Sequence, residues 1–269
     1  MDIPESKVRF IVIYKRIFFC LFLMPALLSA QKFHFQNYNV QQGLIQSQVI
    51  AITQDRYDNL WFCTLGGISR FDGKVFTNYS ETDGLINNFS NCILADHESN
   101  IWIGTVAGIS RFNGTSFKNY LFSENPAANI VKSIKEDADH RIWALSGGTL
   151  YRMNQGEKPL HTIVSGLYER VTTIQTDKEG LLWASIMGKG IYRLERDGWK
   201  MQVTFPENSE WGICQKIVFD NQIRDRVYLM MNNEIYVSER DDVRPLLKSG
   251  SLRRFSDLYQ DGSDKLWFT

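Results

Sequence analysis

The residues with the clearest chemical potential in this sequence are aspartates that stand six positions before a tryptophan. The pattern occurs five times, in the pairs Asp55 and Trp61, Asp96 and Trp102, Asp137 and Trp143, Asp177 and Trp183, and Asp261 and Trp267. Carboxylates in polar turns can ligate calcium, but the glutamate that ends such a loop is replaced by Gly66, Ala107 or Gly148 in the first three copies. We therefore expect structural turns, in which each carboxylate accepts hydrogen bonds from nearby amides.

Motifs for metal binding or catalysis are not found elsewhere in the sequence. The four histidines, His34, His97, His140 and His161, do not stand at metal-ligand spacings, so the sequence predicts no metal site. Nucleophile elbows, phosphate-binding glycine loops and histidine-glutamate zinc motifs do not occur. Acidic residues mostly occupy the repeated turn, so no carboxylate pair for glycoside hydrolysis stands out. We therefore expect no catalytic residue and no cofactor, and the ligand-binding residues stay unknown.

The tryptophans mark a repeat of about forty residues. Their intervals are 41, 41, 40, 45 and 39 when Tyr228 takes one tryptophan position and Asp220 the matching aspartate position. The first unit contains four apolar segments, at 49–53, 60–64, 68–71 and 76–79, with turn residues between them. Four short strands in a unit of this length are typical of a β-propeller blade. Because a blade can bury its faces only against its neighbours, we expect each tryptophan to fill the space to the next blade.

The sequence thus predicts an all-β fold, a β-propeller of four-stranded antiparallel blades over residues 31–269. Five units are complete and the sixth stops within its tryptophan strand, so we expect about five full blades, part of a sixth, and a ring that needs sequence beyond Thr269. The segment Phe35-Gln36-Asn37-Tyr38 repeats the outer-strand motif Phe76-Thr77-Asn78-Tyr79. It predicts a strand that completes the last blade.

Residues 1–30 resemble a secretory signal peptide. Four basic residues precede an apolar run over 17–28, which ends at Ser29-Ala30. The run is shorter than the roughly 20 residues of a membrane-spanning helix, so a retained anchor is the weaker interpretation. We therefore expect export to the periplasm.

Charge and cysteine content argue against nucleic-acid binding and against a disulfide framework. Lys plus Arg and Asp plus Glu are both 30, so no bulk positive charge favours nucleic acid. Three cysteines would follow the signal peptide, at positions 63, 92 and 214, and this odd number does not indicate a disulfide framework. Arg70, Arg111 and Arg193 recur at one point of the unit, where solvated or inter-blade ion pairs are favoured over an anion-binding ring.

The core from Asp96 to Trp102, followed by Gly108-Ile109-Ser110-Arg111-Phe112, resembles the two-component regulator propeller repeat. The first unit repeats it at 67–71, whereas the third and fifth depart from it at 148–151 and 234–236. The resemblance covers about residues 33–269. It implies a periplasmic sensor followed by a β-sandwich module, a membrane helix and a histidine kinase or transcription-factor output, anchored in the inner membrane as a homodimer.

The function implied by this resemblance is non-catalytic ligand sensing and signal transmission. The resemblance implies an oligosaccharide as the ligand, and we expect it to bind on the face formed by the loops at 43–48 and 84–88 and by the turns after the tryptophan strands. Two alternatives stay open from the residues alone. One is an exported propeller enzyme such as a lyase, and the other is a passive adhesion scaffold.

Overall fold

The computed structural model describes residues 36–153, 159–162, 169–205, 212–232, 234–239, 242–248 and 255–269. The expected signal peptide and His34 lie outside this part of the chain. Residues Tyr38–Thr269 form one compact unit. The described residues contain β-strands and three short 3-10 helices, η2 (Val40–Gln42), η3 (Glu81–Asp83) and η4 (Pro126–Asn129). None of their helices is long and apolar enough to cross a membrane.

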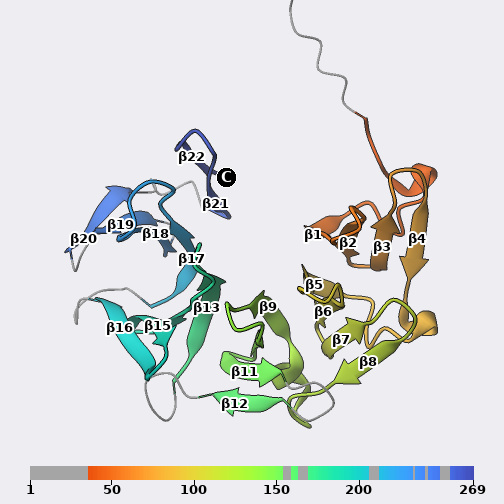
Figure 1. Cartoon of the computed structure of the whole chain (residues 1–269), viewed down its shortest axis with the longest axis horizontal. Helices are drawn as coiled ribbons and strands as arrows, with labels where there is room; N and C mark the ends of the chain where they lie inside the picture. Colours follow the sequence, from red (N-terminus) through yellow and green to blue (C-terminus); the bar gives the residue numbers. More distant parts are fainter. Residues whose placement is uncertain are drawn as a thin grey trace, which may run out of the picture. The chain divides into compact units, whose positions relative to one another are not determined.

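The described residues of the compact unit form five four-stranded antiparallel sheets and one two-stranded sheet, here called blades 1 to 6. Figure 1 shows that the first strand of each of blades 1 to 5 lies innermost and the fourth outermost. The strands of blades 1 to 3 are β1 (Val49–Gln54), β2 (Leu60–Thr64), β3 (Gly67–Phe71), β4 (Phe76–Tyr79), β5 (Ser90–Ala95), β6 (Ile101–Thr105), β7 (Gly108–Phe112), β8 (Phe117–Tyr120), β9 (Val131–Glu136), β10 (Ile142–Ser146), β11 (Thr149–Met153) and β12 (Leu160–Thr162).

Blades 4 to 6 continue the same order along the chain. Their strands are β13 (Val171–Thr176), β14 (Leu182–Ile186), β15 (Gly190–Glu195), β16 (Gly198–Thr204), β17 (Cys214–Phe219), β18 (Arg226–Met231), β19 (Glu234–Glu239), β20 (Asp242–Leu247), β21 (Leu258–Gln260) and β22 (Leu266–Phe268). The predicted fold class, a propeller of four-stranded antiparallel blades, is confirmed. The third and fifth units, which depart from the repeat in sequence, form complete blades.

The hydrophobic core lies between successive blades. Trp102 of blade 2 packs in one cluster with Val131, Ile134 and Ala144 of blade 3. The ring at the tryptophan position is buried in five blades, with exposed fractions of 3% for Trp61, 1% for Trp102, 3% for Trp143, 8% for Trp183 and 8% for Tyr228. Each aromatic side chain therefore fills the space to the next blade, as the period predicts.

Trp267 differs from the other five, because 58% of its side chain is exposed. It lies on β22, the second of only two strands in blade 6. The expectation of a buried ring is wrong at this position. The reason is that burial of this side chain comes from the following blade, and no described strand follows β22.

The backbone conformation requires glycine at the first residue of the third strand in blades 1 and 2. Gly67 and Gly108 have φ angles of 127° and 137°, a region that favours glycine. A Cβ atom at Gly67 would lie 2.4 Å from the carbonyl oxygen of Tyr79, and one at Gly108 would lie 2.6 Å from that of Tyr120. The third strand can thus approach the fourth this closely only without a side chain at its first residue.

The N-terminal copy of the outer-strand motif has no strand to pair with among the described residues, because blade 6 has two strands there and no third strand. The closing strand therefore stays a prediction. Residues 36–38 have no regular secondary structure, and Phe35 lies outside the described residues. The Tyr38 ring instead contacts Phe71 at 5.1 Å and Phe76 at 5.8 Å between ring centroids. Tyr79 makes the equivalent contacts with blade 2, so the tyrosine of this motif packs against the blade that follows it.

Candidate functional site

Each repeated aspartate closes the turn between the first two strands of its blade. In blade 2, Asp96 Oδ1 accepts hydrogen bonds from the amides of Glu98 at 3.0 Å and Asn100 at 2.7 Å. Its Oδ2 accepts a hydrogen bond from Trp102 Nε1 at 2.8 Å. The amide bonds agree with the expectation from the sequence, and the indole bond is a new finding. It joins the two landmarks of the repeat into one unit.

The same geometry recurs in the other blades. The indole bond measures 2.8 Å in blade 1 and 2.7 Å in blades 3, 4 and 6. In blade 5 the Tyr228 hydroxyl donates to Asp220 Oδ2 at 2.7 Å. The longer turn between these two residues fits the different reach of a phenol, so tyrosine in place of tryptophan preserves the bond to the retained aspartate. These aspartates and rings therefore serve packing in this structure, and they leave no free carboxylate for ligand chemistry.

Acid is expected to weaken the blade turns. Burial raises the pKa of the Asp55 carboxyl, but hydrogen bonds from Trp61, Asn59 and the turn amides outweigh it and hold the pKa below 3.8. A carboxylate whose pKa is lower in the folded than in the unfolded chain stabilises the fold at pH values above its unfolded-state pKa. This stabilisation is lost as the pH falls through the folded-state pKa. We expect the melting temperature, followed by circular dichroism, to fall below about pH 4. Asp55→Asn should make that fall shallower, and an unchanged acid profile in this variant would contradict the assignment.

The recurrent arginines lie over the indole of their own blade. Arg70, Arg111 and Arg193 are the cross-strand partners of Trp61, Trp102 and Trp183, with guanidinium-to-ring distances of 5.9, 5.6 and 5.4 Å. Arg193 also pairs with Glu195 at 2.6 Å, within the same blade. The expectation of solvated or inter-blade ion pairs is therefore wrong in this respect: the partners lie within one blade, because the Trp and Arg strands are adjacent.

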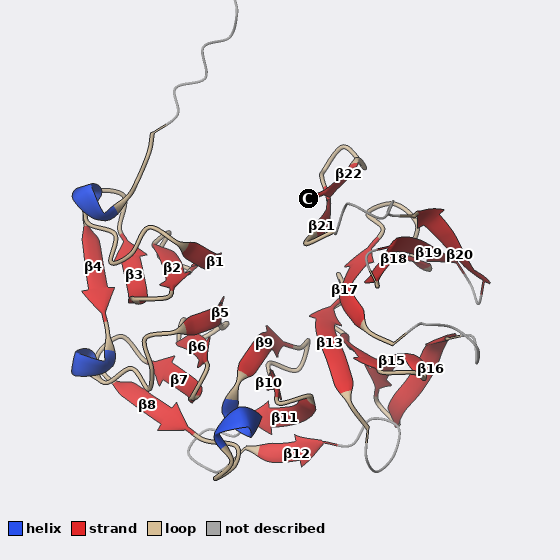
Figure 2. Ribbon diagram, turned by 180° about the vertical axis from the view of Figure 1, so that it is seen from behind, coloured by secondary structure: helices blue, strands red, loops and turns tan. Residues whose placement is uncertain are grey.

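The loops expected to bind ligand are held by the outer-strand motif. Asn78 Nδ2 donates to the Gly43 carbonyl at 3.0 Å, and Asn119 Nδ2 donates to the Gly84 carbonyl at the same distance. Each of these glycines ends a 3-10 helix, η2 or η3, in the segment that leads into a blade. Figure 2 shows these helices in blue. The loops are thus built by the repeat.

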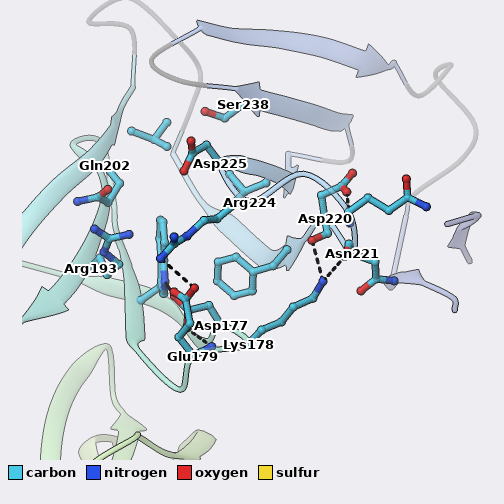
Figure 3. A pocket seen from close by; sticks show the side chains of 15 residues that line it. Asp177, Lys178, Glu179, Arg193, Gln202, Asp220, Asn221, Arg224, Asp225 and Ser238 are labelled. Atoms are coloured by element: carbon cyan, nitrogen blue, oxygen red, sulfur yellow. Dashed lines mark hydrogen bonds and ion pairs between the residues drawn. The ribbon is translucent and has the colours of Figure 1, made fainter.

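A pocket of about 350 Å³ lies between blades 4 and 5 (Figure 3). It is lined by the two turns that follow β13 and β17 and by side chains of the strands beside them. The residues are Asp177, Lys178, Glu179, Trp183, Arg193, Gln202, Val203, Phe219, Asp220, Asn221, Gln222, Arg224, Asp225, Val227 and Ser238. The aspartate turns and the inter-blade loops occupy opposite ends of the strands, so this pocket lies away from the predicted ligand face.

Two contacts across the pocket join the turns of blades 4 and 5. Lys178 Nζ donates to the backbone carbonyls of Asp220 at 3.2 Å and Asn221 at 2.5 Å. Arg224 pairs with Glu179 at 3.0 Å, and their side chains are 81% and 50% exposed. An exposed ion pair contributes little to stability and can open at little cost. The lysine contact therefore holds the two turns together, while the arginine and glutamate can rearrange.

The lining of the pocket combines ring surface with balanced charge. The Trp183 and Phe219 rings lie 5.1 Å apart, and Gln202 and Ser238 add uncharged polar groups. Lys178, Arg193 and Arg224 are offset by Asp177, Glu179, Asp220 and Asp225. Such a lining suits a neutral polar molecule better than a strongly charged one.

The structure brings together two histidines that the sequence separates. His97 and His140 stack with ring centroids 3.8 Å apart, and the Nδ1 atoms of both contact Glu136 Oε1. The three side chains lie close enough to hold one metal ion between them, a juxtaposition that their spacing along the chain did not predict. Spacing along the chain does not reveal the cluster, because His97 belongs to blade 2 and the other two residues to blade 3. An alignment of the turns of successive blades would have shown it.

The thiols are free and buried or half-buried. Cys63, Cys92 and Cys214 form no disulfide in the described residues, in agreement with their odd number. Burial raises the pKa of Cys63 to about 11 and that of Cys214 to about 12. Because the thiolate is the reactive form, neither residue is a nucleophile at neutral pH.

The sequences of blades 1 and 2 match a known repeat family. Residues 43–66 and 84–107, which run from the inter-blade loop through the aspartate turn to the second strand, match the model described as two component regulator propeller. Two blades of this chain are therefore similar in sequence to two-component regulator propeller repeats. No curated protein matches the chain.

Solved structures share the propeller fold. The extracellular domain of a hybrid two component system from B. thetaiotaomicron is 20% identical, with a TM-score of 0.63 over 82% of this chain and 31% of that chain. A second such domain from the same organism is 18% identical, with a TM-score of 0.65 over 84% and 33%. This chain thus spans about a third of the length of these extracellular domains.

An enzyme shares the fold as well. Virginiamycin B lyase from Staphylococcus aureus is 18% identical, with a TM-score of 0.65 over 87% of this chain and 80% of that chain. At this identity the likeness is one of fold, and a propeller can carry unrelated functions. Fold likeness therefore does not decide between sensing and catalysis for this chain.

Proposed function

We propose that this chain is the extracytoplasmic, non-catalytic sensing propeller of a two-component signalling protein, and that its ligand is an oligosaccharide. The match of blades 1 and 2 to the two-component regulator propeller model supports the signalling role. The likeness to extracellular domains of hybrid two component systems agrees with it in fold. Residues 1–30 are proposed to direct export, and residues 31–269 to form the sensor domain in the periplasm.

The remaining parts of the signalling protein are also proposals. A β-sandwich module, a membrane helix and a histidine kinase or transcription-factor output would follow the propeller, and the intact protein would signal as a dimer anchored in the inner membrane. Ligand binding would then change the geometry of that dimer. Nucleic acid is not proposed as a partner, because positive and negative side chains are equal in number.

The pocket between blades 4 and 5 is the proposed ligand site. Sugars present both apolar ring faces and hydroxyl groups, and the pocket offers ring edges beside amide, hydroxyl and carboxylate groups. The exposed ion pair of Arg224 and Glu179 at its rim can rearrange around a ligand. Since two blades contribute the lining, a bound ligand would also stabilise the contact between them.

The test is a glycan array followed by calorimetric titration with the full chain. We expect at least one neutral oligosaccharide to bind, and mass spectrometry should recover it unchanged because the module is not catalytic. Gln202→Ala should weaken that binding about 10-fold, a loss of about one hydrogen bond. Gln202 is half-buried and points to the pocket (Figure 3), so its replacement leaves the blade turns intact.

Phe89→Ala provides the matched control on the opposite, loop face, since Phe89 is 53% exposed there. It should leave binding unchanged. A loss in Phe89→Ala and not in Gln202→Ala would move the ligand to the loop face. Absence of binding to every glycan would contradict the ligand class, and a cleaved glycan would contradict a non-catalytic role.

A further inference from the structure

The cluster of His97, Glu136 and His140 lies where blades 2 and 3 meet. Glu136 is the last residue of β9, His140 lies in the turn that follows it, and His97 lies in the β5–β6 turn of blade 2. One nitrogen or oxygen atom from each residue lies within 4.8 Å of the other two. Glu136 is the most buried of the three, with a side chain that is 15% exposed, against 40% for His97 and 58% for His140.

Backbone contacts hold this junction in place. The His97 amide donates to Glu136 Oε2 at 3.0 Å, which leaves Oε1 facing both imidazoles. The residue after the repeated aspartate also contacts the next blade at other junctions. The Ala138 amide donates to the Gly180 carbonyl at 2.8 Å, and the Asn221 amide donates to Gln260 Oε1 at 2.8 Å. The repeat itself therefore brings the start of one turn against the next blade.

Only one junction of the described blades places imidazoles at this point. The residue in the position of His97 is Arg56, Ala138, Lys178, Asn221 or Gly262 in the other blades. The residue in the position of Glu136 is Gln54, Ala95, Thr176, Phe219 or Gln260. His140 has a φ of 61°, and the corresponding positive-φ positions hold Asp58, Ser99, Gly180 and Asp264. Three departures from the repeat thus converge on one place, and neither the fold nor the turn geometry requires them.

We infer that His97, Glu136 and His140 form a site for a divalent transition metal of the zinc type, bound across the junction of blades 2 and 3. Imidazole nitrogen and carboxylate oxygen are ligands that Zn²⁺ accepts at about 2.0–2.2 Å in tetrahedral geometry. Ca²⁺ and Mg²⁺ prefer oxygen alone, so two imidazoles select against them.

The electrostatics of the cluster also favour one shared cation. Two imidazoles stacked at 3.8 Å cannot both carry a proton without like-charge repulsion, whereas two neutral rings can offer lone pairs to one metal ion. Tetrahedral coordination would require the rings to turn apart, and both are exposed enough to do so. Three protein ligands leave a fourth position for water or for an oxygen atom of a ligand.

The test is titration of the chelator-treated full chain with Zn²⁺ against a chromophoric competitor. We expect one equivalent to bind and the melting temperature to rise, because the metal joins two blades and binds only the folded state. His97→Ala and His140→Ala should each weaken binding by at least about 100-fold, since even outer partners of metal ligands are worth 10–100-fold. Glu136→Gln should weaken it and leave the imidazoles in place.

Arg56→Ala is the matched control, because Arg56 has the turn position of His97 in blade 1. It should bind Zn²⁺ as the unaltered chain does. Binding to Co²⁺ should give a visible spectrum without thiolate charge transfer, which separates this site from the cysteines. Absence of one-equivalent binding, equal affinity in a His97→Ala, His140→Ala double variant, or stronger binding of Ca²⁺ than of Zn²⁺ would overturn the inference and leave an inter-blade hydrogen-bond cluster.

Discussion

Replacing Trp102 by alanine is expected to lower the free energy of unfolding by about 3–5 kcal/mol. The ring is 1% exposed and packs against Val131, Ile134 and Ala144 of the next blade, so truncation leaves a cavity at the blade interface. It also removes the indole donor of Asp96 Oδ2. In a domain of this size the change corresponds to a melting temperature lower by roughly 6–20 °C, measured by calorimetry or circular dichroism.

Trp267→Ala is the matched control for this prediction. Trp267 donates the same hydrogen bond to its aspartate, at 2.7 Å, but 58% of its side chain is exposed. We expect its replacement to cost less than about 1 kcal/mol, because little apolar surface leaves water at this position. Equal losses in the two variants would show that the hydrogen bond, and not inter-blade packing, is the contribution of these tryptophans.

Replacing Asp96 by alanine is expected to cost about 2–4 kcal/mol, because unmatched buried donors cost about 1–3 kcal/mol each. The carboxylate accepts hydrogen bonds from the amides of Glu98 and Asn100 and from the Trp102 indole. Of these donors, the indole and the Asn100 amide are buried. Chemical denaturation followed by tryptophan fluorescence measures both the loss of stability and any change around the indole.

Asp261→Ala is the corresponding control in blade 6. Its carboxylate makes the same three bonds, but Trp267 is exposed and its indole can turn to water. We expect a loss below about 1 kcal/mol there. A similarly small loss of unfolding free energy in Asp96→Ala would mean that water replaces the carboxylate at no cost. The backbone alone would then determine the shape of the turn.

The sequence by itself determined the fold and the repeated landmarks. The period of about forty residues, the alternation within each segment and the glycine at or just before the third strand of blades 1 to 4 all act over short distances along the chain. The strands of blade 1 begin and end within one residue of the predicted segments, and the two-component regulator propeller resemblance rests on the same local residues. Departures at 148–151 and 234–236 did not matter, because strand pairing uses backbone groups that any residue supplies.

Only the tertiary structure decided which side chains outside the repeated landmarks meet between the blades. His97 meets Glu136 because the stacking of blades places residues about forty positions apart side by side, and no local pattern carries that information. The pocket between β13–β16 and β17–β20 arises in the same way, as does the packing of Tyr38 on blade 1. A repeat predicts what its units share, whereas sites form where individual side chains of neighbouring units differ from the repeat.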